Sequence, residues 1–193
     1  MVGTESQMLE IGTQAPPFNL KDVISDNDVS LAEYKGEVGT LIFFISNHCP
    51  FVIHIRDQFK MLSDEYTAKG IKFIAINSNS IETHPQDGPE NMKKLASEKE
   101  WTFPFLFDST QEVAKAYLAA CTPDLYLFDK TLKLYYRGQL DSSRPGNDIP
   151  VTGKDLRNAL DLLLDEKPYP ENQLPSIGCN IKWAPGNEPD YFG

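Results

Sequence analysis

Hydrophobic positions change their spacing near residue 50, and this change predicts the central elements of the fold. The run TLIFFIS (40–46) is continuously apolar and β-rich, which is typical of a strand buried on both faces. From Phe51 to Tyr66 the apolar residues recur every three or four positions, which predicts an amphipathic helix ending at Gly70. A second apolar run, IKFIAINS (71–78), predicts another buried strand. Strand, helix and strand should therefore form one right-handed parallel crossover.

The remaining pattern predicts further helices and strands around this unit. Helices are expected at about 88–99, within STQEVAKAYLAA with Ser109 as its cap and Glu112 completing a capping box, and at about 153–165. Strands are expected in FNLKDV and DVSLAEYKG as a pair near the N-terminus, in FPFLFD, and in DLYLFD and LKLYYRG as an antiparallel hairpin. The pattern predicts an α/β fold, a mixed sheet with helices on both faces and an N-terminal β extension.

The length of the chain favours one domain. Its 193 residues are enough to bury a substantial core, and no linker or repeat interrupts the pattern. We expect a single domain over 1–193 with its core at about 12–165. Residues 166–193 are rich in Pro, Gly and Asn and lack periodicity, so we expect an irregular tail on the surface, pinned by Trp183 and Tyr191.

Charge and composition narrow the classes of partner. The formal net charge of -10 argues against nucleic acid or an anionic membrane surface as the main partner, because both require clustered Lys and Arg. No segment reaches the roughly 18 apolar residues of a membrane helix, and the N-terminal sequence does not resemble a secretory signal. We therefore expect a cytoplasmic protein, in which three cysteines need not form disulfides.

The stretch ISNHCPFVIH (45–54) places Cys49 where the strand turns into the helix. The start of a helix favours an anion and lowers cysteine pKa values from about 8.5, which makes a reactive thiolate there. Pro50 suits this position because its missing N–H is not needed at a helix start. His48 adds a positive charge or a hydrogen bond nearby. The alternative is that Cys49 packs as a small apolar residue, and the pattern leaves both interpretations open.

Other site chemistries find no support in the sequence. The cysteines and histidines show no paired spacing such as CxxC or HxxxH, so no structural zinc site is predicted. Glycine-rich phosphate loops and the GxSxG motif are absent as well. We predict no metal and no cofactor.

The order of motifs resembles a known superfamily. A strand, a Cys-Pro pair opening a long helix, and Thr122-Pro123 before a strand and hairpin resemble thioredoxin-like proteins, over about residues 12–165. The combinations NHCPF, CTPDLYLFD, YRGQLDSSRPGN and SIGCNIKW are similar to those of the redoxin branch, the AhpC/TSA or peroxiredoxin-like proteins. The resemblance implies a thioredoxin-like fold with Pro123 as a cis-proline against Cys49.

The sequence lacks key residues of both the thioredoxins and the peroxiredoxins. Thioredoxin-type exchange uses CxxC, but Val52 stands where the second cysteine would be, so this turn cannot form its own disulfide. Ser46 matches the Thr/Ser of the peroxiredoxin motif. Pro123 stands where the peroxide-polarising arginine of peroxiredoxins would align, which leaves Arg137 and Arg144 as the candidates for that role.

Any resolving sulfur must come from Cys121 or Cys179. Cys121 is two residues before Pro123, in a loop that faces the nucleophile in this fold, so it either forms a disulfide with Cys49 or ends a helix with its side chain in the core. Cys179 lies in the predicted tail, and it is either a mobile resolving thiol or a buried anchor beside Trp183.

These features predict a thiol-dependent oxidoreductase that acts on a disulfide or a peroxide and serves as an antioxidant in the second case. The predicted site is Cys49 with Ser46, His48, Cys121 and Pro123, and Cys179 is a possible resolving thiol. A thiol reductant such as thioredoxin or glutathione would then be the partner. The alternative is a non-catalytic thioredoxin-fold binding module or redox sensor, which the missing CxxC partner and arginine support.

Overall fold

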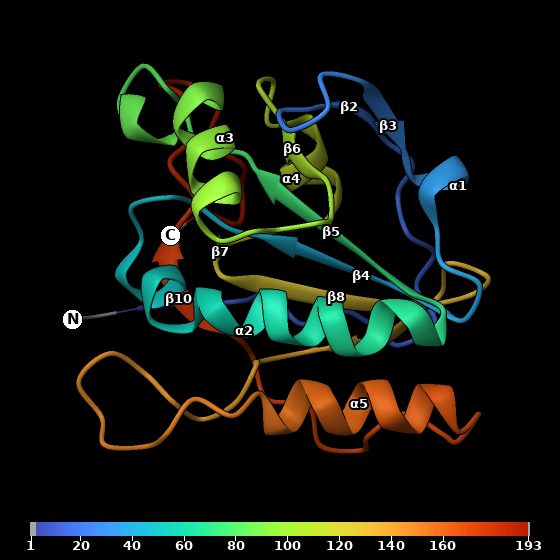
Figure 1. The fold of residues 1–193 in the computed structure, drawn as a ribbon. Helices are drawn as coiled ribbons and strands as arrows, with labels where there is room; N and C mark the ends of the chain where they lie inside the picture. The colour runs from blue at the N-terminus through green and yellow to red at the C-terminus, as the bar shows by residue number, and fades with distance from the viewer. Residues whose placement is uncertain (1–2, 193) are drawn as a thin grey trace.

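The structure, a computed structural model, describes residues 3–192 and places the predicted strand–helix–strand unit at the centre of the fold (Figure 1). Strands β4 (Gly39–Phe44) and β5 (Ile71–Asn77) run parallel, and helix α2 (Pro50–Tyr66) connects them. A short 3-10 helix (Thr67–Lys69) then leads to Gly70, whose φ of 91° lies in the left-handed region that favours glycine. The predicted parallel crossover is confirmed.

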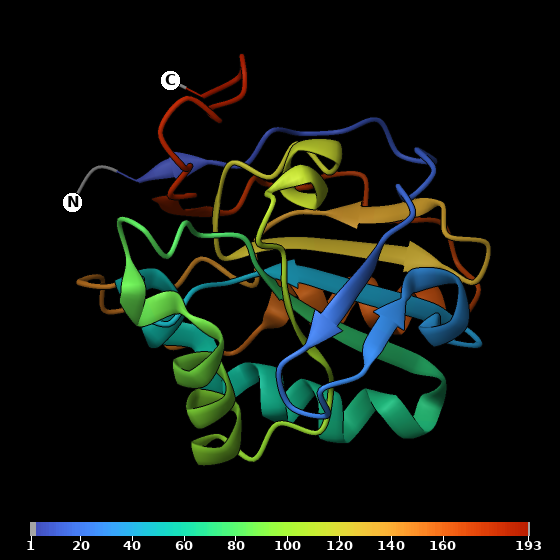
Figure 2. The same ribbon diagram turned by 90° about the horizontal axis from the view of Figure 1, so that it is seen from above.

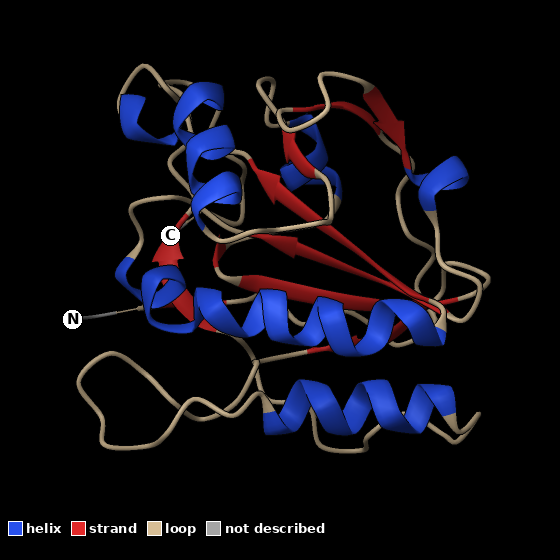
Figure 3. Ribbon diagram, in the orientation of Figure 1, coloured by secondary structure: helices blue, strands red, loops and turns tan. Residues whose placement is uncertain are grey.

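The main sheet has seven strands in the order β3-β2-β6-β5-β4-β8-β9. Figure 3 shows the strands of the molecule in red. Besides β4 and β5 it contains β2 (Asn19–Asp22), β3 (Asp28–Ser30), β6 (Phe105–Phe107), β8 (Asp124–Asp129) and β9 (Leu134–Arg137). Strand β6 pairs parallel with β5, whereas β8 pairs antiparallel with β4. The expected N-terminal pair, β2 with β3, and the expected hairpin, β8 with β9, are both antiparallel.

Helices cover both faces of this sheet (Figure 2). Helices α2, α3 (Pro89–Glu98) and α5 (Lys154–Leu164) share one buried apolar cluster with Phe43 of β4. The short helices α1 (Leu31–Tyr34) and α4 (Glu112–Ala116) contribute to a second cluster around Phe44, because successive strand residues face opposite sides. The predicted mixed sheet with helices on both faces is confirmed. No helix formed by residues 3–192 combines the length and the apolar character that crossing a membrane would require.

A second, smaller sheet brings the C-terminal tail to the start of α2. Its strands are β1 (Thr4–Glu5), β10 (Ile177–Asn180) and β7 (Cys121–Thr122), and β10 pairs antiparallel with both neighbours. The sequence pattern did not predict β10, because only Gly178 of its four residues is fully buried and no alternation results. Pairing with β7 makes this segment a strand.

Helix α4 begins later than predicted, and its cap is a different residue. The prediction that Ser109 caps the helix is wrong, because α4 begins at Glu112, after Gln111, and Ser109 is exposed. The buried carboxylate of Asp108 accepts the backbone N–H of Ala114 at 2.9 Å instead. An acidic side chain one residue earlier thus satisfies a free N–H of the first turn.

Candidate active site

Cys49 lies at the corner where β4 leads into α2, as the sequence predicts. It is the N-cap residue of α2 rather than a first-turn residue, and Pro50 takes the first helical position. The Cys49 side chain is 0% exposed and makes no capping hydrogen bond. The thiol therefore sits at the positive end of a 17-residue helix but is shielded from solvent.

The loop that carries Pro123 faces Cys49 directly. The Thr122–Pro123 peptide bond is cis, as the resemblance implied. The Cys49 thiol donates to the Thr122 carbonyl oxygen at 3.1 Å, and the Thr122 hydroxyl lies 3.3 Å from the Ser46 hydroxyl. The structure thus brings Ser46, Cys49 and Pro123 together.

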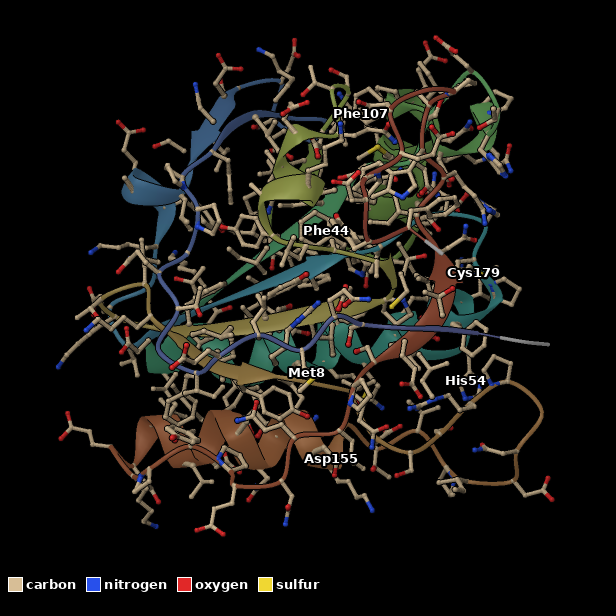
Figure 4. All side chains as sticks on the ribbon, turned by 180° about the vertical axis from the view of Figure 1, so that it is seen from behind. Met8, Phe44, His54, Phe107, Asp155 and Cys179 are labelled. Carbon is tan, nitrogen blue, oxygen red and sulfur yellow. The ribbon has the colours of Figure 1, made fainter. Side chains whose placement is uncertain are left out.

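Cys179 is the second sulfur at this site. In the pairing of β10 with β7 it stands opposite Thr122, so its side chain faces the same side as that of Thr122. Burial and, next, interaction with the Cys49 sulfur raise the pKa of Cys179 from an ordinary value of 9.0 to about 12. Cys179 is half-buried and packs against the cluster that contains Cys49, whereas Trp183 belongs to the other cluster. It is therefore not an anchor beside Trp183. Figure 4 shows Cys179 on β10, at the same end of the molecule as His54.

Cys121 is buried behind the cis-proline loop. Its sulfur lies 3.6 Å from the Pro123 carbonyl oxygen and 4.0 Å from that of Ser176, where it can donate a hydrogen bond. Adjacent strand residues point to opposite faces, so Cys121 faces away from the side that Thr122 and Cys179 share. Burial, followed by the nearby Asp124, raises the pKa of Cys121 well above its ordinary value. Cys121 thus has its side chain in the core, as one alternative expected, but it begins strand β7 instead of ending a helix.

His48 is held by a buried carboxylate that the sequence reasoning missed. The Nδ1 atom of His48 lies 2.7 Å from Asp87, which is fully buried and also accepts the backbone N–H of Asn47 at 2.8 Å and the side-chain N–H of Asn79 at 2.7 Å. The His84 ring stacks on His48 with a centroid distance of 4.9 Å. Burial and, next, the neighbouring His48 lower the pKa of His84.

The loop that contains Asp87 follows β5, at the carboxyl end of the parallel strands. Its sequence, SIETHPQDG, is mostly polar, and its exposed residues favour an ordinary solvated loop. The signal that identifies it as part of the site is its position, because this edge of a parallel sheet is where ligand sites form. It lines the rim of the Cys49 corner.

Both candidate arginines are bound to groups other than Cys49. The guanidinium of Arg137 is fully buried and forms a two-pronged ion pair with Asp124 of β8. Arg144 donates to the carbonyl oxygens of Asp141 and Ser143 at 2.6 and 2.7 Å. Both guanidinium groups are therefore engaged in holding the loops and strands around the site.

The remaining groups do not form a metal centre. No set of three His, Cys, Asp or Glu side chains within residues 3–192 is arranged to hold a metal ion. His54 lies one turn along α2, where its Nε2 atom is 2.7 Å from the Ser143 hydroxyl. That hydroxyl donates to the Ile149 carbonyl oxygen at 2.6 Å, so His54 donates to it and supports the 141–149 loop.

Comparisons with known proteins identify the family and the relatives that this chain resembles. The profile of the AhpC/TSA family matches residues 11–137. The crystal structure of an uncharacterized conserved protein from Geobacillus kaustophilus is 57% identical, with a TM-score of 0.94 over 96% of this chain and 98% of its own. A candidate peroxiredoxin of Mycobacterium tuberculosis is 28% identical over 123 residues, which are 64% of this chain and 73% of its own.

A more distant solved structure identifies the fold. The thioredoxin domain of a thiol-disulfide oxidoreductase from Bacteroides vulgatus is 21% identical and superposes with a TM-score of 0.56, over 68% of this chain and 91% of its own. The predicted thioredoxin-like fold is therefore confirmed. The similarity to the Geobacillus protein also extends well past residue 137, where the family match ends.

Proposed function

Because the chain belongs to the AhpC/TSA family of thioredoxin-like proteins, we propose that it is a thiol-dependent oxidoreductase in which Cys49 is the nucleophile and Cys179 the resolving thiol. The observation that carries this proposal is the position of Cys179, which stands opposite Thr122, the hydrogen-bond partner of the Cys49 thiol, and packs against the cluster that contains Cys49. Cys179 supplies from the tail the second sulfur that Val52 cannot supply from the helix. A disulfide between them would replace the CxxC disulfide of thioredoxins.

Disulfide exchange is the reaction that this pair supports best. The Cys49 thiolate attacks one sulfur of a substrate disulfide, which forms a mixed disulfide and releases one substrate thiolate that takes a proton from water. Cys179 then loses its proton to solvent and attacks the Cys49 sulfur, and the second substrate thiolate leaves and is protonated. The substrate gains two electrons, and a Cys49–Cys179 disulfide remains. A thiol reductant such as thioredoxin or glutathione would regenerate the two thiols.

Peroxide reduction is less well supported by the site. Peroxide cleavage needs a polarising cation at the thiolate. Arg137 is paired with the buried Asp124, and Arg144, which lines a cavity with Phe51 and Pro123, donates to the carbonyl oxygens of Asp141 and Ser143. The antioxidant role belongs to that second activity. The cytoplasmic location stays a prediction.

A trapping experiment tests the proposed roles. Reduced wild-type protein and the variants Cys49→Ser, Cys121→Ser and Cys179→Ser are mixed with oxidised glutathione, alkylated and mapped by mass spectrometry. We expect a Cys49–Cys179 disulfide in the wild type and in Cys121→Ser. Cys179→Ser should stop at a Cys49–glutathione mixed disulfide, because the resolving thiol is missing.

The outcomes separate this proposal from its alternatives. Turnover that survives in Cys49→Ser would remove Cys49 as the nucleophile. A mapped disulfide between Cys49 and Cys121 would transfer the resolving role to Cys121. If no variant reacts with oxidised glutathione or with hydrogen peroxide, the chain is the non-catalytic binding module.

A further inference from the structure

Strand β10 covers the thiol that the proposed reaction uses. The Cys49 side chain is 0% exposed. Its sulfur interacts with the Thr122 carbonyl oxygen and with Cys179 of β10. Pairing between β10 and β7 places Cys179 opposite Thr122 and Asn180 opposite Cys121. A disulfide carried by another protein cannot approach Cys49 along the line of attack while β10 occupies this edge. Some element must move before exchange with a protein can occur.

The weakest attachment at the site is that of β10 itself. The main sheet buries all six residues of β4, whereas three of the four residues of β10 are partly exposed. Its partners β7 and β1 are two residues long each, and the small sheet is separate from the main one. Short, partly exposed strands open at the lowest cost in free energy. The chain is held on both sides of β10, by the buried Ser176, bonded to Ser6 and Gly138, and by Lys182, which donates to Asn79, so β10 opens as a short segment between these two points.

We propose that β10 is a built-in competitor for a docking site, and that an extended segment of a partner protein replaces it on the edge of β7 and delivers its disulfide to Cys49. The proposal rests on the proposed function of Cys49 and adds that the tail of this chain occupies the edge that the substrate segment needs. Backbone pairing to an exposed strand edge is a general way to bind such segments. In this structure, strand β10 from the tail of the same chain is the segment paired with that edge of β7.

The fit of β10 also defines the sequence that the edge accepts. A Cβ atom on Gly178 would overlap the Thr122 carbonyl oxygen, so the residue before the cysteine must be glycine. Ile177, one residue earlier, lines a cavity of ≈ 180 Å³ together with Phe51 and Arg144. The edge should therefore accept an apolar residue, then glycine, then the reacting cysteine.

Competition for one edge also explains why the resolving cysteine lies on β10. The Cys49 thiolate attacks the partner's disulfide while the partner occupies β7, which gives a mixed disulfide and one free partner thiolate. When β10 returns, it displaces the partner's strand and brings Cys179 to the Cys49 sulfur. Cys179 attacks that sulfur, the second partner thiolate leaves, and both released thiolates take protons from water. Cleavage of the mixed disulfide and release of the reduced partner then occur in the same step.

Binding of a peptide without cysteine tests the docking site independently of the chemistry. The probe is a fluorescent peptide of residues 176–182 with serine in place of the cysteine, SIGSNIK, and its matched control is SIASNIK, which differs by one methyl group. The receptor is the full chain with Gly178→Val, whose own β10 cannot fit against Thr122. We expect SIGSNIK to bind about tenfold more tightly than SIASNIK, a clear difference for one group that must overlap backbone.

The wild-type protein and a second glycine variant complete the design. SIGSNIK should bind wild type and Gly186→Asn more weakly than Gly178→Val, because β10 competes in both; Gly186 has φ 79° and open space around it, which asparagine tolerates. If Gly178→Val does not fold, the peptide at saturation must still accelerate amide hydrogen exchange in β10 of the wild type while leaving β4 unchanged. Equal binding of the two peptides, no binding, or unchanged exchange in β10 would overturn the docking site.

These readouts keep the two proposals apart. Because SIGSNIK has no sulfur, its binding is unaffected by whether Cys49 is a nucleophile. Glycine-selective binding together with turnover in Cys49→Ser would leave the docking edge intact and remove the proposed function. Formation of a Cys49–Cys179 disulfide with oxidised glutathione, without a preference for SIGSNIK, would support the proposed function and remove the docking edge.

Discussion

At the scale of single residues, the two sulfurs of the site have different surroundings. The Cys49 thiol donates a hydrogen bond to the Thr122 carbonyl oxygen at 3.1 Å. Burial and the adjoining sulfur raise the pKa of Cys179 to about 12. Of the two, only Cys49 stands at a helix N-terminus. This difference supports the proposed order, in which Cys49 attacks first and Cys179 second.

The raised pKa of Cys179 predicts a loss of stability at alkaline pH. Above pH 9 the thiol ionises in the unfolded chain, whereas the folded protein keeps its proton until about pH 12. The unfolded state then binds fewer protons, so the stability from this group is complete below pH 9 and decreases as pH rises toward 12.

Urea denaturation of reduced wild type and Cys179→Ser from pH 7 to about pH 11 measures this effect. The difference in free energy of unfolding between the two proteins should stay constant up to pH 9 and shrink above it. Curves that remain parallel over the whole range would show that Cys179 titrates normally in the folded protein.

At the scale of elements, the loop after β5 holds the start of α2 and the tail together. Asp87 of this loop accepts hydrogen bonds from Asn47 and His48, which precede Cys49. Asn79 donates to Asp87 and accepts the backbone N–H of Lys182, two residues beyond β10, at 2.8 Å. One polar network thus fixes the separation between the corner that carries Cys49 and the strand that carries Cys179.

Asp87→Asn should disturb this network specifically. The new amide N–H group would face N–H donors that the carboxylate now satisfies, so we expect a loss of about 1–3 kcal/mol in the free energy of unfolding. Closure of the Cys49–Cys179 disulfide after oxidised glutathione should also slow, because the two elements lose their common support. The control is Glu82→Gln in the same loop, which is exposed and should change stability by less than about 0.5 kcal/mol. Equal closure rates in both variants would contradict a positioning role for Asp87.

The sequence pattern predicted those elements in which apolar residues recur at the spacing of a helix or a strand. The apolar runs of β4 and β5, the spacing in α2 and the hairpin of β8 and β9 depend on burial that recurs within each segment. Strand β10 and the Asp87 network depend on partners distant in the chain, Thr122 for the one and Asn47 for the other. Ser109 failed as a cap because Asp108, one residue earlier, reaches the helix from a buried position.

At the scale of the whole molecule, Arg137, a member of a buried ion pair in the main sheet, also bonds to the segment that follows the first strand of the small sheet. Arg137 of β9 pairs with Asp124 of β8, stacks over the Tyr126 ring at 3.7 Å, and donates from Nε to the Gln7 carbonyl oxygen at 3.0 Å. Gln7 follows β1, the strand that flanks β10 on the side away from β7. The ion pair therefore helps to hold the small sheet over Cys49.

Removing the charge of Asp124 should loosen this cover as well as the core. Asp124→Asn leaves the fully buried Arg137 without its counter-ion, which typically costs about 3–5 kcal/mol. The exposed pair of Lys21 and Asp28 provides the matched control, because Asp28→Asn should cost at most about 1 kcal/mol. Urea denaturation measures both losses. Alkylation of Cys49 should also accelerate in Asp124→Asn but not in Asp28→Asn, because the small sheet loses its support through Gln7. Destabilisation without faster alkylation would mean that the ion pair supports the main sheet alone, and that β10 covers Cys49 independently of it.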